Sequence, residues 1–155
     1  MNILRRNVLK GAGAAGAVSV AMAAGLLKPG MAFASDWNKG LFETKELGGV
    51  MGAVGGTGAA AGDISVKAPD IAENGAVVPV EITSNIAGTE SITIIGEKNS
   101  LPMIAQFNLS NGARGYVSTR IKMGNTSNVR AVVKAGGKMY TAAKEVKVTI
   151  GGCGG

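Results

Sequence analysis

A single cysteine is the residue with the clearest capacity for chemistry in this 155-residue sequence. Cys153 is flanked by Gly151 and Gly152 on one side and by Gly154 and Gly155 on the other. Glycine has no side chain and tolerates almost any backbone conformation, so such a tail can enter a narrow channel and fit sites of different shapes. A thiol on a thin, flexible arm therefore predicts a covalent attachment point for a substrate.

Other roles for Cys153 fit the sequence less well. A free cysteine is often a small buried hydrophobe, but the flanking glycines offer it no apolar partners. An exposed thiol could instead cross-link two chains by a disulfide in an oxidising compartment, or relay electrons by thiol exchange with a partner's cysteine. We expect substrate carriage, and the main alternative is an exported immunoglobulin-like binding or structural module whose Cys153 forms an interchain disulfide.

The remaining composition excludes most catalytic chemistry. The chain has no histidine, which removes Ser-His-Asp and Cys-His pairs and the commonest metal ligand. One cysteine cannot build a multi-thiolate metal site. An ordinary thiol has a pKa of about 8.5, so only a few per cent is thiolate at neutral pH, and no general base precedes Cys153 closely. We expect a carrier with no catalytic residues, no metal and no cofactor, whose thiol is activated by the enzymes that receive the arm.

Residues 1–34 have the features of an export signal. Arg5 and Arg6 belong to a basic segment that resembles a twin-arginine leader, and an apolar stretch follows it. The triplet Ala-Phe-Ala that ends at Ala34 matches an A-x-A cleavage site. We predict cleavage after Ala34 and export to the bacterial periplasm, with no membrane attachment after cleavage.

Most of the positive charge belongs to this leader. The chain has 16 Lys and Arg against 10 Asp and Glu, a net charge of +6. Four of the basic residues and none of the acidic ones precede residue 35, which leaves +2 for the rest. With aromatic residues at only 4%, this composition gives no support for nucleic-acid binding, and we expect no nucleic-acid partner.

Residues 35–62 predict a short helix followed by a glycine-rich loop. Apolar residues recur at roughly helical spacing over 38–52. Several glycines in this stretch each weaken a helix by up to about 1 kcal/mol relative to alanine. We therefore expect the helix to depend on tertiary or partner contacts, and residues 55–62 to form a loop.

From residue 63 onward the apolar period becomes two, which is typical of β-strands. Turn-forming pairs such as Asn-Gly and Gly-Gly separate the predicted strands. These cover residues 63–68, 75–84, 91–96, 102–108, 115–123, 128–135 and 138–150. Pro79 predicts that its strand lies at a sheet edge or contains a bulge. The pattern predicts an all-β, immunoglobulin-like sandwich of about seven strands over 63–150, with the carrier arm over 151–155.

The leader, the β-rich domain and the ending Val-Thr-Ile-Gly-Gly-Cys-Gly-Gly together resemble the SoxY family, the sulfur-carrier subunits of the periplasmic thiosulfate-oxidising Sox system. The resemblance implies that Cys153 holds thiosulfate-derived intermediates, first as cysteine S-thiosulfonate and then as a persulfide. It also implies a heterodimer with a SoxZ-type β-sandwich subunit. The implied transient partners are a c-type cytochrome complex that conjugates thiosulfate, a dimanganese hydrolase that releases sulfate, and either a sulfane dehydrogenase or another sulfur acceptor.

Overall fold

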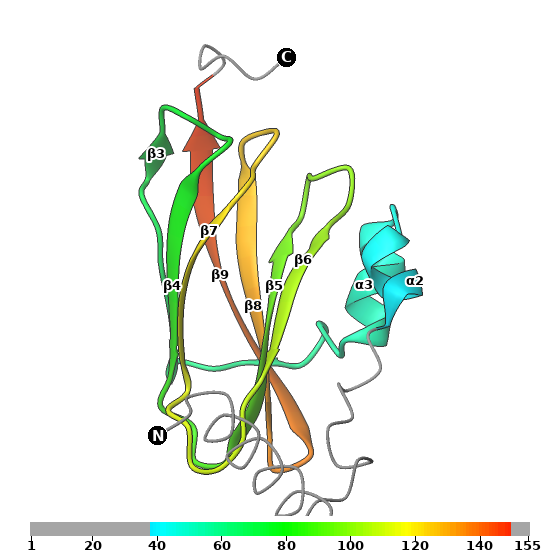
Figure 1. The fold of residues 1–155 in the computed structure, drawn as a ribbon, viewed down its shortest axis with the longest axis vertical. Coiled ribbons are helices and arrows are strands. Elements are labelled where there is room, and N and C mark those ends of the chain that lie inside the picture. Colours follow the sequence, from blue (N-terminus) through cyan, green and yellow to red (C-terminus); the bar gives the residue numbers. More distant parts are fainter. Residues whose placement is uncertain (1–37, 150–155) are drawn as a thin grey trace, which may run out of the picture. The chain divides into compact units, whose positions relative to one another are not determined.

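Two packed β-sheets and two short helices make up the described part of the chain, residues 38–149 of the computed structural model (Figure 1). The predicted signal peptide and its cleavage after Ala34 lie outside the described residues. The arm over 151–155 lies outside them as well. The described residues therefore cover the domain that precedes the predicted arm.

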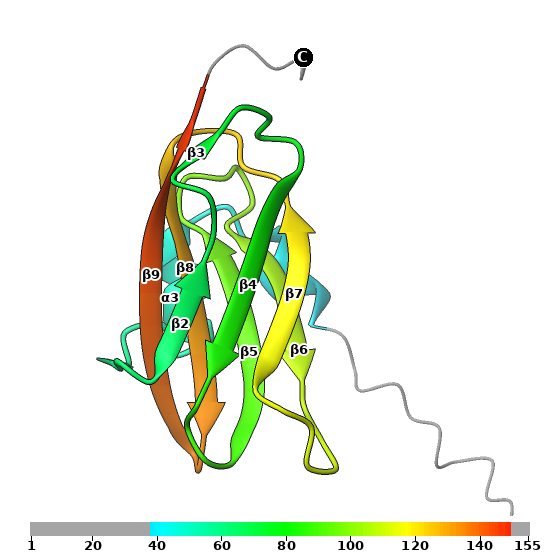
Figure 2. The same cartoon turned by 90° about the vertical axis from the view of Figure 1, so that its left-hand side faces the viewer.

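The smaller sheet has three antiparallel strands and faces the viewer in Figure 2. Its centre is β4 (Val78–Ser84), between β2 (Ile64–Lys67) and β7 (Tyr116–Ile121). In β7, Val117 and Ile121 are buried and the alternate positions are largely exposed. This alternation is the one that the sequence predicted for a half-buried strand.

The larger sheet contains the remaining strands. They are β9 (Lys138–Val148), β8 (Ser127–Ala135), β5 (Thr89–Gly96) and β6 (Met103–Asn108), in that order, with β1 (Ala59–Ala60) and β3 (Ile71–Ala72) paired in parallel with β9. The orders β2-β4-β7 and β9-β8-β5-β6 correspond to the A-B-E and G-F-C-C′ sheets of immunoglobulin-like domains. The predicted sandwich and its seven principal strands are confirmed.

The main core lies between the two sheets. Ile82 from the smaller sheet and Ile94 and Val133 from the larger one are fully buried there. Burying a side chain of this size stabilises a fold by about 1.5–3 kcal/mol relative to exposure. Burial of alternate residues on both inner faces therefore fixes the register of each strand.

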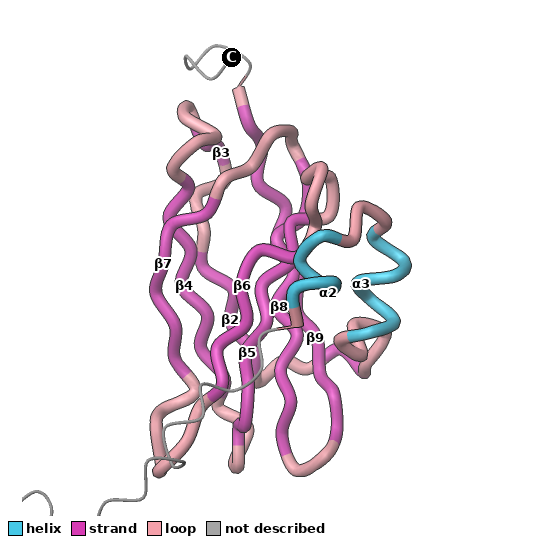
Figure 3. The backbone as a smooth tube through the Cα atoms, turned by 45° about the vertical axis from the view of Figure 1, so that its right-hand side comes forward, coloured by secondary structure: helices cyan, strands magenta, loops and turns pink. Residues whose placement is uncertain are grey.

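Two helices pack on the outer face of the larger sheet, on the far side from the smaller sheet (Figures 1 and 3). They are α2 (Lys39–Glu43) and α3 (Leu47–Ala53), and Val50 of α3 belongs to a small apolar cluster with Ile95 of β5. The predicted helical segment before the sandwich is confirmed, but the sequence predicted one helix over 38–52 and the structure has two. The chain is extended at Thr44, where α2 ends, so the segment forms two helices.

The position predicted for the strand that contains Pro79 was also wrong. β4 is the central strand of its sheet, and its pairing shows no bulge. The proline is accommodated because β2 ends at Lys67, opposite Glu81. Ser84 N–H donates to Gly115 O, so by alternation Pro79 directs its ring nitrogen away from β7, toward the side where β2 has already ended.

Candidate functional site at the root of the carrier arm

Strand β9 leads directly to the predicted attachment point. It ends at Val148, Thr149 is the last described residue, and Cys153 and its glycines lie outside the described residues. Cys153 is four residues beyond Thr149, so an extended chain would place it about 13–14 Å from there. The geometry of the root therefore sets the point from which the arm starts.

On one side, the root is bonded to β3. The N–H of Lys147 donates to Asp70 O at 2.9 Å, and the N–H of Thr149 donates to Ala72 O at 3.1 Å. The Lys144 ammonium also lies 3.0 Å from the Asp70 carboxylate. Asp70, which directly precedes β3, and Ala72 of β3 thus close the outer edge of β9 at the point where the strand ends.

On the other side, a single threonine side chain bonds both backbone groups of Val148. The N–H of Val148 donates to the Thr126 hydroxyl at 2.9 Å, and this hydroxyl donates to Val148 O at 3.4 Å. Thr126 directly precedes β8, the strand that pairs with β9. We call Asp70, Ala72 and Thr126 the root clamp, because together they bond the end of β9 from both sides.

Apolar packing holds the same segment against the core. Val146 is fully buried, and Val148 packs against the main core cluster. The β3–β4 loop passes so close at Gly75 that an added Cβ would lie 2.8 Å from Val148 Cγ1. The same Cβ would overlap the backbone oxygen of Met123, so any larger residue at Gly75 would displace the chain at Met123 or the root, and here glycine is required by space.

A cavity of about 380 Å³ lies next to the clamp. It is lined by Lys98, Asn99, Ser100, Leu101, Met103, Ile104, Lys122, Gly124 and Asn125. Asn125 adjoins Thr126 of the clamp. No ion pair of Lys98 or Lys122 occurs among residues 38–149. The two ammonium groups make this end of the sandwich attractive to anions.

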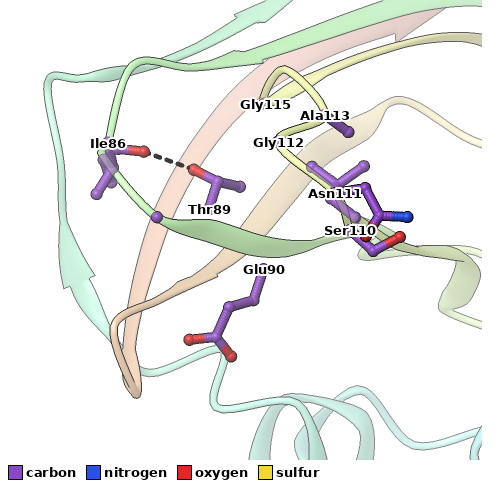
Figure 4. A pocket seen from close by; sticks show the side chains of 10 residues that line it. Ile86, Thr89, Glu90, Ser110, Asn111, Gly112, Ala113 and Gly115 are labelled. Atoms are coloured by element: carbon purple, nitrogen blue, oxygen red, sulfur yellow. Dashed lines mark hydrogen bonds between the residues drawn. The ribbon is translucent and has the colours of Figure 1, made fainter.

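Another cavity, of about 470 Å³, lies at the opposite end of the sandwich, between the β4–β5 and β6–β7 loops (Figure 4). The Thr89 hydroxyl donates to Ile86 O at 2.8 Å on its wall. The hydrogen bond from Lys134, followed by that from the N–H of Gly137, lowers the pKa of Glu90. Gly137 belongs to the turn where β9 begins, so this cavity is remote from the arm root.

The described residues contain no group of three or more His, Cys, Asp or Glu that could hold a metal ion. Within the same range, no helix is long and apolar enough to cross a membrane. The residues that bond the arm root were missed at the sequence level. A two-residue strand such as β3 has no periodicity, and the bonds of Thr126 depend on which strand it meets in space.

One known family matches most of the chain. Residues 51–153 match the family described as "Sulfur oxidation protein SoxY", and the matched region reaches Cys153. The chain belongs to the SoxY family. The resemblance inferred from the leader, the β-rich domain and the glycine-flanked cysteine is thereby confirmed.

A solved member of the SoxY family has the same fold. The structure of the sulfur carrier protein SoxY from Chlorobium limicola f thiosulfatophilum is 42% identical, covers 68% of this chain and 97% of its own, and superposes with a TM-score of 0.60. The superoxide reductase neelaredoxin from Ignicoccus hospitalis is 16% identical, covers 63% of this chain and 87% of its own, and has a TM-score of 0.48. No curated protein sequence matches the chain.

Proposed function

We propose that the chain carries sulfur intermediates covalently on Cys153 and presents them to the enzymes of sulfur oxidation. The observation that carries the proposal is the family match, which extends along the sandwich and ends at the cysteine. The related chain from Chlorobium is described as a sulfur carrier protein. The root clamp supports the same conclusion, because a delivery arm needs one end fixed while the other reaches its targets.

The proposed cycle has three steps on the Cys153 sulfur. In the first, the thiol and thiosulfate form an S–S bond, giving cysteine S-thiosulfonate, and one proton and two electrons leave to the c-type cytochrome complex. In the second, water cleaves the terminal S–S bond and sulfate leaves, so that a persulfide remains. In the third, the outer sulfur of the persulfide is either transferred to an acceptor, which restores the thiol, or oxidised with three waters by a sulfane dehydrogenase, which takes up six electrons and leaves an S-sulfonate on Cys153. Water then cleaves the S–S bond of the S-sulfonate, so that sulfate leaves and the thiol is restored.

The protein's own contribution is to position the intermediate and to keep it attached. The S-thiosulfonate is an anion, and Lys98 and Lys122 supply positive charge at the end of the sandwich where the arm begins. An anionic adduct is favoured near such ammonium groups, and salt screens this attraction over about 10 Å at 0.1 M. Covalent attachment also keeps reactive sulfur from diffusing away between enzymes.

We also propose that the leader directs the chain to the periplasm through the twin-arginine route. There the leader is cleaved after Ala34, and the chain assembles with a SoxZ-type subunit. N-terminal sequencing of the periplasmic protein tests the export step. The expected first residue is Ser35, and retention of Met1 in the periplasmic protein would contradict cleavage.

Intact mass spectrometry tests the central claim. Protein purified from its native host during growth on thiosulfate should carry sulfur and sulfonate adducts that map to Cys153. Cys153→Ser should fold normally, carry no adduct and lose thiosulfate-dependent turnover in a reconstituted system. A reducible dimer as the only modified species would instead support the cross-linking alternative. Transient mixed disulfides without sulfur adducts would support a redox relay.

A further inference from the structure

Two loops meet at the end of the sandwich where β9 ends (Figure 1). The loop between β5 and β6 contains Lys98 and Asn99. The loop between β7 and β8 contains Lys122 and Gly124. The side-chain amide of Asn99 donates to Lys122 O at 2.7 Å, and its oxygen accepts from the N–H of Gly124 at 3.1 Å. One side chain thus bonds the two loops together, and both loops line the cavity of about 380 Å³ beside the root clamp.

The positive charge of this cavity has no counterpart in its lining. Lys98 and Lys122 line the cavity, both are exposed, and neither forms an ion pair among residues 38–149. No Asp or Glu is among the described residues of the lining. Glu97 directly precedes Lys98, but its two carboxylate oxygens accept from Arg130 Nε at 2.8 Å and from Asn128 Nδ2 at 2.9 Å. Two ammonium groups without a nearby carboxylate partner favour an anion in the cavity.

The rest of the lining indicates which kind of anion fits. Leu101, Met103 and Ile104 supply an apolar part, and Leu101 is 44% exposed. Sulfate has oxygens in every direction, so it would leave some of them against apolar groups without a hydrogen bond, at a cost in free energy. Thiosulfate has three oxygens at one end and a polarizable sulfur at the other, and such a sulfur packs favourably against apolar side chains. An anion with one charged and one soft end therefore matches the lining better than sulfate does.

We propose that this cavity is a noncovalent binding site for thiosulfate. Lys98 and Lys122 attract its oxygens, and Leu101 contacts its terminal sulfur. The inference rests on the proposed function, in which thiosulfate is the molecule that is joined to Cys153. It adds that the carrier itself binds the free substrate before any bond to the cysteine forms.

The position of the cavity gives such a site its use. Asn125 lines the cavity and directly precedes Thr126. The hydroxyl of Thr126 bonds Val148 at the root of the arm. Thiosulfate held there is concentrated at the end of the sandwich from which the arm starts. The substrate is then already close to the carrier when the enzyme that forms the S–S bond arrives.

Amide chemical shifts during a titration with sodium thiosulfate test the site. The chain carries Cys153→Ser, so that only noncovalent binding is measured, and sodium chloride keeps the ionic strength constant. The amide signals of Asn99, Gly124 and Asn125 should shift, whereas that of Asn111 at the opposite end should not. Sulfate should bind about fourfold more weakly or less tightly still, because it lacks the sulfur that packs against the apolar lining.

Two double variants with the same change in net charge separate a site from general attraction. Lys98→Gln with Lys122→Gln should raise the dissociation constant for thiosulfate about tenfold, because both ammonium groups of the cavity are lost. Lys45→Gln with Lys138→Gln is the control, since both lysines are exposed, unpaired among residues 38–149 and absent from the lining. The control should stay within about twofold. Leu101→Ser should keep sulfate binding and abolish the preference for thiosulfate.

Three outcomes overturn the proposal. Equal weakening by the two double variants would show that the anion responds only to the net charge of the chain. Equal affinities for thiosulfate and sulfate would contradict the role of the apolar lining, and shifts that bypass Asn99 and Gly124 would place binding elsewhere. Adducts on Cys153 test carriage separately. Carriage without thiosulfate binding would overturn this inference alone, and thiosulfate binding without adducts would overturn the proposed function.

Discussion

The two outer edges of the larger sheet differ in what their backbone groups bond to. Along β9, the outer edge is bonded within the chain, first by β1 and then by β3. Along β6, Gln106 and Asn108 direct their backbone groups into open space. The edge that leads to the cysteine is fixed internally. The same sheet thus combines one edge that is bonded within the chain with one whose last strand pairs only with β5.

The largest expected loss of stability follows a substitution at the closed edge, where β1 and β3 bond to β9. Gly58 lies so close to Met139 O that an added Cβ would overlap it. Gly58→Val should therefore displace β1 from β9 and lower the free energy of unfolding by about 1–3 kcal/mol. Gly62→Val is the matched control, because no atom lies within 4 Å of its Cβ position. Equal losses for the two variants in urea denaturation would show that β1 contributes nothing to the closed edge.

The root clamp should show the next largest effect. Thr126→Val keeps the shape of the side chain but leaves the N–H of Val148 without its acceptor, at a cost of about 1–2 kcal/mol. Amide exchange at Val148 should accelerate, and turnover by the arm's enzymes should fall. Thr126→Ser keeps the hydroxyl and should restore both. If the valine variant exchanges as slowly as the unmutated chain, β3 alone holds the root.

A substitution at the open edge should have little effect on stability. Gln106→Thr on β6 should change the free energy of unfolding by less than about 0.5 kcal/mol, because the side chain is exposed. Val133→Thr in β8 is the contrasting control, since it places a hydroxyl in the core at a cost of about 1–3 kcal/mol. A large loss for Gln106→Thr would contradict the description of β6 as a free edge.

The smallest expected effect concerns Glu90, which binds Lys134 and the turn where β9 begins. The hydrogen bond from Lys134 lowers the pKa of Glu90 below its ordinary value of 4.5. Its carboxylate therefore stabilises the fold above that value, and this contribution is lost as the pH falls through the lowered pKa. In thermal unfolding, the difference between the unmutated chain and Glu90→Gln should shrink on acidification. A difference that is constant with pH would contradict a role for the carboxylate charge.

Much of the fold could be predicted from the sequence because its signals are local. Alternation in Tyr116–Ile121 follows from the pleat of a strand with one buried face. The Asn-Gly and Gly-Gly pairs mark turns because they tolerate a positive φ, and Asn111, Gly112, Gly136 and Gly137 all adopt one. Glycines within 38–52 predicted a weak helix. The position at which this helix is interrupted depends on packing against the sheet.

The candidate site also has one part that the sequence predicts and another that only the structure shows. The sequence by itself identified the candidate attachment residue, since Cys153 is the only thiol in the chain, and it determined a two-sheet sandwich through the period of its apolar residues. Only the tertiary structure decided that Thr126 and β3 bond the strand that leads to that cysteine, and that one edge closes while the other stays open. Those contacts join residues distant in sequence, as when Ala72 accepts from Thr149. Their energies depend on strand register and order, which no local pattern of side chains specifies.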